Sequence, residues 1–511
     1  MRRPLTFLHS VSTDNRRSSR HRCRRRRTRR GPRAAPSVQE QIHLHPTLSP
    51  ARKLGNISSP PFLLHPAGFS HPSSISQLEK QRGYTCGGQL NGHLNQGIYY
   101  PRDSLKTELC IRGRRMLYDY CREHDIPHKK LGKLIIARTP EERGYLDELY
   151  AKSQAMNGDE GLRRRVMSGW QKKKVERGEE EEEEELVRLR RLDGAETLAL
   201  EPDLNRTVCG SLWSPESGII HSHAFIASLE NYILNSPNGA LVYRSTVVRI
   251  DPDPHGHGWV VQTTSPRPGD AHLGERNSVL VHSLINCAGL NAHNLYNQIQ
   301  YPSQRRLQIG FCKGSYYAYG SRTGVSSVRH LIYPTPRQGG GGRGGKGLEG
   351  LGTHLTLDME GKIKFGPDVE WLDIPLSSAS PKEEIQDFWF NHLAPNPARL
   401  HSTFQFVSSY LPGIDPHHFV PDYAGIRPKL RTGKDGIHDE MNERILGGLD
   451  DFVMMESAGM MSVLGIESPG LTSALAIAER VSRRVARFHH SSSHTDRLQT
   501  LSDVGELDQW A

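Results

Sequence analysis

The segment Gly425-Ile426-Arg427-Pro428-Lys429 places two cationic side chains beside a glycine and a proline. A Gly-x-Arg-Pro sequence predicts a turn in which proline fixes the backbone and directs the guanidinium. Arginine can bind a carboxylate through two parallel hydrogen bonds. The segment therefore indicates an anion-binding position with Arg427 and Lys429 as candidates, and the alternative is a surface salt bridge.

A second segment, 465–472, has the sequence Gly-Ile-Glu-Ser-Pro-Gly-Leu-Thr and predicts the beginning of a helix. Ser468 is a favourable N-cap and Pro469 a favourable first helical residue. The N-terminus of a helix offers free N–H groups and a partial positive charge. The segment therefore predicts either a position for an anionic ligand or an ordinary capped core helix.

A third segment, Ile285-Asn286-Cys287-Ala288-Gly289-Leu290, ends an apolar run with small residues. Small residues after a strand let the backbone pass close to a flat ligand. Any junction between a strand and a turn has similar features, so this segment carries meaning only together with the other two.

Strands and helices alternate around these segments, which predicts an α/β chain with a second domain built on a sheet. Hydrophobic periodicity and caps predict helices over 104–120, 140–156, 224–234 and 469–488, and strands over 134–137, 240–248, 258–263, 279–288, 311–319 and 352–365.

Two stretches interrupt this pattern and are expected to be insertions near 157–190 and 337–350. The first contains seven consecutive glutamates, 179–185, and such a like-charge block is usually a solvated loop. The second is rich in glycine and leads into a strand, so we expect a flexible insertion and not a phosphate-binding loop.

The positive charge of the chain is concentrated at its beginning. The net charge is +10, and the first 33 residues contribute +12 through thirteen arginines and one aspartate, so the remainder is near −2 (+10 minus +12). A near-neutral body is not typical of a nucleic-acid-binding domain. The arginine-rich, acid-poor leader predicts a mitochondrial transit peptide, and the alternatives are a disordered basic tail, a nuclear-localisation patch or an RNA-binding segment.

Cysteine usage and hydropathy exclude further classes. The seven cysteines contain no C-x-x-C pair, which indicates reduced thiols and neither a disulfide framework nor a zinc site. No stretch of about 18 apolar residues is present, so a membrane-spanning helix is not expected.

Several segments together resemble the L-2-hydroxyglutarate dehydrogenase family, FAD-dependent oxidoreductases of the D-amino-acid-oxidase superfamily. The resemblance covers roughly 97 to 483. It is carried by Gly-Ile-Tyr-Tyr-Pro (97–101) with Ser-Leu-Lys (104–106), Arg-His-Leu-Ile-Tyr-Pro (329–334), Gly-Thr-His-Leu-Thr (352–356) and Ile-Glu-Ser-Pro-Gly-Leu-Thr (466–472).

This resemblance implies an α/β (α+β) fold with a Rossmann-like FAD-binding domain, incomplete at its N-terminus, and a mostly antiparallel substrate-binding domain. The implied boundaries are 1–95 for the leader and an atypical segment, 96–125, 215–305 and 420–488 for the FAD-binding domain, 126–214 and 306–419 for the substrate domain, and 489–511 for a tail.

The implied reaction is oxidation of the C2 alcohol of L-2-hydroxyglutarate to 2-oxoglutarate. Hydride would pass to flavin N5, and electrons would pass on to a non-nicotinamide acceptor such as a quinone or a flavoprotein, with peripheral membrane association. His354 is the implied base, because a neutral imidazole suits proton transfer near pH 7. The implied substrate-binding residues are Tyr99, Arg427 and Lys429, and the implied FAD contacts are Val247, Ala288, Gly289, Gly425, Arg427, Gly465, Ile466, Ser468 and Gly470.

The chain departs from this family in two places. The first 96 residues lack a G-x-G-x-x-G sequence, whose backbone would bind a pyrophosphate at a helix N-terminus. Asn95 stands where family members usually carry a histidine. These departures leave three alternatives open: a chain whose first 95 residues come from a misassigned first exon and which lacks activity, a related FAD-dependent oxidase of amino acids or glycerol 3-phosphate, and an RNA-binding protein.

Overall fold

The computed structural model describes residues 91–168, 185–243, 245–267, 270–298, 308–336, 352–372, 392–431, 451–457 and 459–490. All of these belong to one compact unit. The arginine-rich leader, the glutamates up to 184 and the glycine-rich stretch 339–350 lie outside the described residues.

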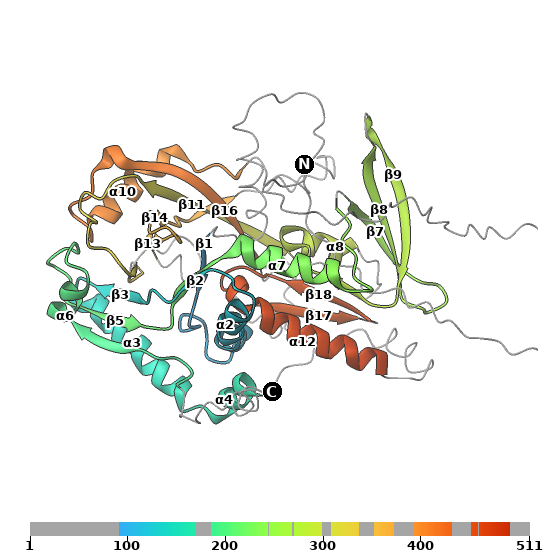
Figure 1. Ribbon diagram of the computed structural model, residues 1–511, viewed down its shortest axis with the longest axis horizontal. Helices are drawn as coiled ribbons and strands as arrows, with labels where there is room; N and C mark the ends of the chain where they lie inside the picture. Colours follow the sequence, from blue (N-terminus) through green and yellow to red (C-terminus); the bar gives the residue numbers. More distant parts are fainter. Residues whose placement is uncertain are drawn as a thin grey trace, which may run out of the picture. The chain divides into compact units, whose positions relative to one another are not determined.

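A nine-stranded, mostly antiparallel sheet dominates the described structure (Figure 1). The strands β3 and β12 run parallel to each other within it. In spatial order the strands are β15 (Glu370–Leu372), β11 (Gln308–Tyr319), β14 (Ile363–Gly366), β13 (His354–Leu357), β12 (Leu331–Pro334), β3 (Lys133–Ala137), β5 (Gly210–Ser214) and β4 (Arg190–Asp193), while β16 (Phe419–Arg431) pairs with β11.

Three smaller sheets accompany the large one, and one of them contains a parallel pair, β10 with β18. The expected α/β fold with a mostly antiparallel part is thus confirmed. The small sheets are β1 (Asn91–Leu94), β6 (Gly218–His221) and β2 (His128–Lys129); β10 (Leu284–Asn286), β18 (Met460–Leu464) and β17 (Val453–Ser457); and β7 (Thr246–Pro252), β8 (Trp259–Arg267) and β9 (Asp270–Val281).

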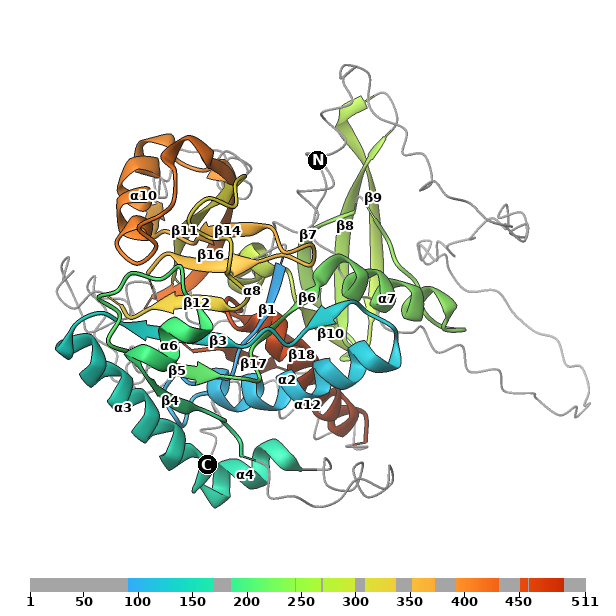
Figure 2. The same ribbon diagram turned by 60° about the vertical axis from the view of Figure 1, so that its left-hand side comes forward.

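The two longest helices of the described chain, α2 and α12, lie side by side in both ribbon views (Figures 1 and 2). A Cβ atom at Gly113 of α2 would lie 2.3 Å from the Thr472 carbonyl oxygen of α12, so glycine permits this close approach. The helices are α2 (Leu105–Glu123), α3 (Pro140–Asn157), α4 (Glu160–Met167), α6 (Gly194–Leu200), α7 (Ser222–Asn235), α8 (Ala292–Gln298), α10 (Leu400–Ser408) and α12 (Gly470–His490), with 3-10 turns η1 (Gly289–Asn291), η3 (Pro397–Arg399) and η4 (Pro416–His418).

The strand β3 is buried on both faces because its side chains alternate between two apolar cores. Leu134 and Ile136 pack into the core that includes α10. Ile135 and Ala137 pack into the core that includes α3 and α4. This double burial explains why the predicted strand over 134–137 is a continuous apolar run.

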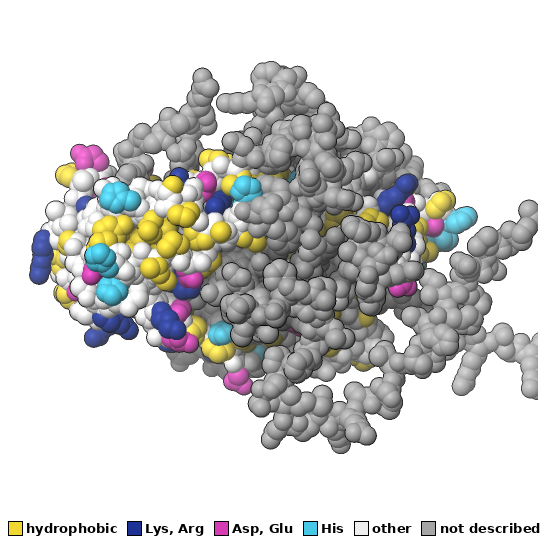
Figure 3. All heavy atoms as spheres, turned by 90° about the horizontal axis from the view of Figure 1, so that it is seen from above, with side chains coloured by type: hydrophobic (Ala, Val, Ile, Leu, Met, Phe, Trp, Pro, Cys, Tyr) yellow, Lys and Arg dark blue, Asp and Glu magenta, His cyan; other side chains and the backbone are white. Residues whose placement is uncertain are grey.

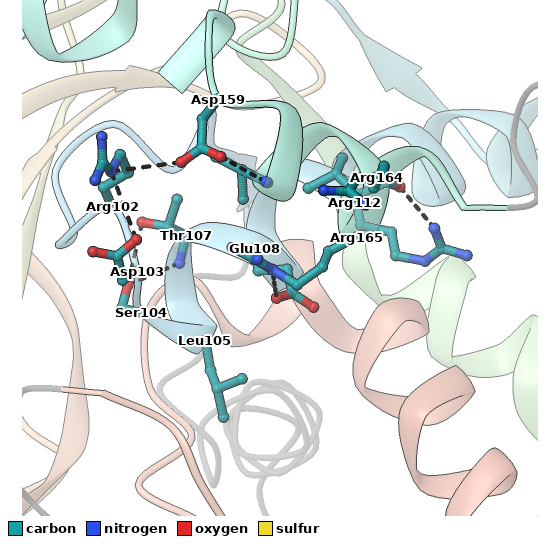
Figure 4. A network of polar contacts seen from close by, with 12 residues as sticks. Arg102, Asp103, Ser104, Leu105, Thr107, Glu108, Arg112, Asp159, Arg164 and Arg165 are labelled. Atoms are coloured by element: carbon teal, nitrogen blue, oxygen red, sulfur yellow. Dashed lines mark hydrogen bonds and ion pairs between the residues drawn. The ribbon is translucent and has the colours of Figure 1, made fainter. Parts of the chain in front are cut away.

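Ion pairs join α2 to α4 and α12. Arg165 of α4 lies 2.9 Å from the carboxylate of Glu108 on α2, as Figure 4 shows, and Arg480 of α12 pairs with the same carboxylate. Arg112 of α2 pairs with Glu479 of α12 at 2.5 Å. These contacts tie together helices that are far apart in sequence.

Several predicted elements differ from the observed ones. The helix α4 and the strand β1 occupy residues expected to be an insertion and an atypical leader, and the strand expected over 279–288 is divided into β9 and β10. The strand expected over 240–248 begins only at Thr246. The Pro469 carbonyl accepts the first helical bond of α12 from Ser473 at 3.0 Å, so Pro469 and not Ser468 precedes the helix.

The surface drawn in Figure 3 carries hydrophobic side chains with Lys, Arg, Asp, Glu and His side chains around them in its described part. Among the described helices, none is both long enough and apolar enough to cross a bilayer.

The N-terminus of α2 should depend on a cap from a distant residue. The Asp451 carboxylate accepts hydrogen bonds from the backbone N–H groups of Leu105 and Lys106, both at 2.8 Å. We expect Asp451→Ala to lower the free energy of unfolding in urea by about 0.5–2 kcal/mol, because two N–H groups lose their acceptor. The exposed neighbour Asp103 provides the control, and Asp103→Ala should change stability by less than about 0.5 kcal/mol. Equal effects of the two substitutions would contradict the capping role.

Candidate active site

Two histidines and a tyrosine from three different strands meet in the interior. The ring of His354 on β13 stacks on Tyr333 of β12 with 3.7 Å between centroids and 9° between planes. His93 Nδ1 of β1 lies 2.7 Å from the Tyr333 hydroxyl oxygen, a hydrogen-bond distance. All three side chains are buried.

Lys133 on β3 adds a cation to this cluster. Its Nζ lies 4.6 Å from the ring centroid of Tyr333 and 4.8 Å from that of Tyr99. The side chain is only 1% exposed, and among the described residues its ammonium group has no hydrogen-bond partner. The parallel pairing of β3 with β12, in which Lys133 lies opposite Leu331, brings this lysine beside Tyr333.

Burial and mutual repulsion set the protonation states of this cluster. Burial, followed by the charge of Lys133, lowers the pKa of His93 to about 3. Burial also holds the pKa of His354 well below its usual value, with further contributions from His93, Lys133 and Arg427. Burial lowers the pKa of Lys133 to about 8. At pH 7 the two imidazoles are therefore neutral and able to accept a proton, while Lys133 remains mostly charged.

Arg427 lies in the middle of β16 opposite Cys312 of β11, so the turn predicted for 425–429 is wrong. Its Nη2 donates to the Asp368 carbonyl oxygen at 3.3 Å. A Cβ atom at Gly314 would lie 2.3 Å from this Nη2, so the glycine leaves room for the guanidinium. The electrostatic influence of Arg427 on His354 places this cation near the histidine cluster.

Lys429 is engaged in an ion pair, unlike the carboxylate-binding role predicted for it. Its Nζ lies 2.6 Å from Glu467 Oε1, and Lys106 Nζ of α2 lies 2.8 Å from the same oxygen. Glu467 is 6% exposed and stands three residues before α12 begins. The two lysines therefore share one buried acid.

The predicted flavin-contacting residues fall into two groups. Ala288 and Gly289 follow β10, where Gly289 has a φ of +60° and begins η1. Gly465 follows β18 with a φ of +65°, and a Cβ atom there would lie 2.7 Å from Leu430 Cδ1. Ile466 and Gly470 contact each other closely, Ser468 is exposed, and Gly425 lies opposite Gly314 within the large sheet.

Val247, predicted to contact adenine, lies on β7 and packs against the core of Ile250 and Trp259. This core also contains Leu284 of β10 and Met460 of β18, so Val247 and the segment at Ala288 border connected elements. The contact of Val247 with a cofactor stays a prediction.

The described residues fit the ring end of a flavin. Glycines at 289 and 465 keep side chains out of two strand ends, and the cations Lys106, Lys429 and Arg427 gather beside the start of α12. Such cations and a helix N-terminus complement negative charge on a reduced flavin ring. The segment in which a pyrophosphate-binding sequence was expected lies outside the described residues up to 90.

Two of the cluster residues, His93 and Lys133, were missed by sequence reasoning. Lys133 directly precedes the apolar run of β3, and a lysine at the start of a doubly buried strand was the available signal. His93 lies two residues before Asn95, whose backbone N–H donates to Thr472 Oγ1 at 3.3 Å. The weaker candidate His221 accepts the Ala224 N–H at 3.1 Å and caps α7.

A sequence profile described as FAD dependent oxidoreductase matches residues 74–484. The chain therefore belongs to this family of FAD-dependent oxidoreductases. The match begins well before residue 97, so the boundary expected there is wrong.

Relatives narrow the comparison. The chain is 32% identical over 421 residues to the mitochondrial L-2-hydroxyglutarate dehydrogenase of Arabidopsis thaliana, covering 77% of this chain and 74% of the relative. It is 24% identical over 463 residues to L-2-hydroxyglutarate dehydrogenase of Escherichia coli strain K12, covering 85% and 92%. A solved L-alpha-glycerophosphate oxidase from Mycoplasma pneumoniae with FAD bound shares the fold, with a TM-score of 0.53, 17% identity and coverage of 79% and 84%.

Burial of neutral His93 predicts that acid destabilises the fold. In the unfolded chain its pKa returns to about 6.5, so between about pH 6.5 and about pH 3 the unfolded state binds more protons. The free energy of unfolding should therefore fall with pH in this window, by up to about 1.4 kcal/mol per unit for one group. Urea unfolding at about pH 7.5 and about pH 5 should show a weaker pH dependence for His93→Asn than for the wild type.

The matched control is His401→Asn, which changes an exposed histidine on α10. It should retain the pH dependence of the wild type. If His93→Asn behaves like this control, burial of a neutral His93 is not the source of the acid sensitivity.

Proposed function

We propose that this protein is a dehydrogenase that binds FAD and oxidises the C2 alcohol of L-2-hydroxyglutarate to 2-oxoglutarate, passing electrons to a non-nicotinamide acceptor. The observation that carries the proposal is the buried neutral His354, whose Nδ1 has no partner among the described residues, with Arg427 and Lys133 close enough to shift its pKa. Removal of the hydroxyl proton from a 2-hydroxy acid requires such a base next to carboxylate-binding cations.

FAD, when bound, would supply the two-electron acceptor for the hydride. The residues that would border its ring are Ala288, Gly289, Gly465 and Lys106, together with the start of α12. Lys106 and Lys429 already share the charge of Glu467, so Arg427 is the cation more available to a substrate carboxylate.

The protein residues would perform the proton transfer. Arg427 would orient the substrate through the carboxylate next to the hydroxyl-bearing carbon. His354 Nδ1 would accept the hydroxyl proton, and stacking on Tyr333 fixes the plane of its ring. Because burial keeps His354 unprotonated at pH 7, no prior deprotonation is needed.

Relatives support the choice of substrate over the alternatives. Both relatives described above are named L-2-hydroxyglutarate dehydrogenase, and each covers more than two thirds of its own length. A glycerol 3-phosphate dehydrogenase from Caloramator mitchellensis is 24% identical but is covered over only 60% of its length. An oxidase of amino acids or glycerol 3-phosphate is therefore the second candidate.

We also propose a mitochondrial location. The arginine-rich, acid-poor leader supports it, as does the mitochondrial designation in the name of the Arabidopsis relative. The electron acceptor is proposed by class alone, as a quinone or a flavoprotein, with the enzyme at a membrane surface.

The first test is the visible spectrum of the purified full chain after incubation with FAD and desalting. The proposal expects a retained flavin spectrum that is bleached anaerobically by L-2-hydroxyglutarate. Retained flavin that is bleached only by an amino acid or glycerol 3-phosphate would favour the second candidate. Failure to retain flavin would overturn the proposal for this chain.

Loss of the proposed base should slow chemistry without removing the cofactor. We expect His354→Asn to retain FAD but to reduce the rate of anaerobic flavin reduction by about 10²–10⁴-fold, the usual contribution of a general base. His401→Asn again serves as the control and should reduce flavin at the rate of the wild type. A His354→Asn protein that reacts within about threefold of the wild type would assign the proton transfer to another group.

A further inference from the structure

The ammonium group of Lys133 is the most unusual charge in the described structure. It is almost fully buried, and it contacts the faces of two aromatic rings, Tyr99 and Tyr333, instead of a carboxylate or carbonyl. Ring faces attract a cation, but they do not replace the hydrogen bonds that water gives to an ammonium group. The position is therefore complete only when an acceptor is added.

The neighbouring groups do not neutralise Lys133. His93 and His354 are neutral, and burial raises the pKa of the nearby Cys110 thiol to about 12, so this thiol is also uncharged. The acid Glu467 is already shared by Lys106 and Lys429. The interior around His354 consequently contains two cations, Lys133 and Arg427, for which the described residues provide no carboxylate within ion-pair distance.

Other polar atoms in the same cluster lack partners as well. The Tyr99 hydroxyl and His354 Nδ1 are buried without a hydrogen bond to any described residue. The pKa of Tyr99 is raised well above its usual value, chiefly by burial, so its hydroxyl keeps its proton and can donate. An ammonium group and a phenolic hydroxyl together are suited to a carboxylate.

We propose that Lys133, with Tyr99, binds the second carboxylate of a dicarboxylate substrate, while Arg427 binds the carboxylate beside the reacting carbon. This inference rests on the proposed function, and it assigns the dicarboxylate specificity to one residue. Lys133 is then a specificity-determining residue, because a monocarboxylate would leave its ammonium group unpaired. That penalty would discriminate against substrates that lack the second acid.

The kinetic test compares L-2-hydroxyglutarate with L-2-hydroxypentanoate, which has the same carbon chain but one carboxylate. In Lys133→Met, kcat/KM for L-2-hydroxyglutarate should fall about 10- to 100-fold, mainly through a higher KM, as expected for loss of a charge-assisted hydrogen bond. The value for L-2-hydroxypentanoate should change by less than about threefold. Lys133→Arg should restore part of the preference. Equal losses on both substrates would overturn the inference.

The matched control is Lys364→Met. Lys364 lies on β14 of the same sheet and also faces a tyrosine ring, Tyr423 at 5.1 Å, but its ammonium group is paired with Asp422 at 2.8 Å. This variant should keep the substrate preference of the wild type. A shared loss of preference in both lysine variants would indicate a general effect on the sheet and would overturn the inference.

A binding measurement separates this inference from the proposed function. Glutarate should raise the melting temperature of the wild-type protein, butyrate should not, and Lys133→Met should abolish the response to glutarate. This response does not require turnover, so an inactive protein that still distinguishes the two acids through Lys133 would contradict the proposed reaction while supporting the anion site. A wild-type protein that does not respond to glutarate, or a Lys133→Met protein that responds equally, would overturn the anion site.

The same variant is expected to fold. Methionine replaces a buried ammonium group that has no acceptor with an apolar chain of similar length, and such exchanges are often neutral or stabilising. The melting temperature of Lys133→Met without ligand should therefore equal or exceed that of the wild type. A marked decrease would mean that the ammonium group has a structural role, and this result would overturn the inference.

Discussion

The carboxylate of Glu467 holds the candidate site together. It is buried between the ammonium groups of Lys106 and Lys429, which come from α2 and from β16 of the large sheet, while Glu467 itself directly precedes α12. A buried acid is costly unless its charge is compensated, and here two cations compensate it. The first long helix, the large sheet and the last helix must therefore meet at this point.

This arrangement decides which cations remain available. Because Glu467 occupies Lys106 and Lys429, the charge of Arg427 and Lys133 is left without an acid in the described interior. Their field, added to burial, keeps His93 and His354 neutral. One ion triad thus separates structural cations from those that face the histidine cluster. Buried groups that lack partners are expensive, and proteins retain them mainly at functional sites.

Local sequence predicted the elements that local forces determine. The cap at Ser104 and the apolar periodicity after it predicted α2, and Thr139 followed by Pro140 begins α3 as the pattern indicates. The turn predicted around Arg427 is wrong because β16 pairs with β11 alone, so a strand with one paired neighbour can accommodate Pro428. The meeting of His93, Lys133 and His354 was not predictable, since it depends on the pairing of strands that are distant in the chain, including the parallel pair β3 and β12.

Thr472 connects the two ends of the described chain in a way that bears on biosynthesis. Its hydroxyl donates to the carbonyl of His93 and accepts from the N–H of Asn95, contacts that span 379 and 377 residues. A nascent chain cannot form these bonds until α12 has left the ribosome. The histidine cluster must then form after translation is nearly complete, and the early strands, including the doubly apolar β3, remain exposed to chaperones or to aggregation until that moment.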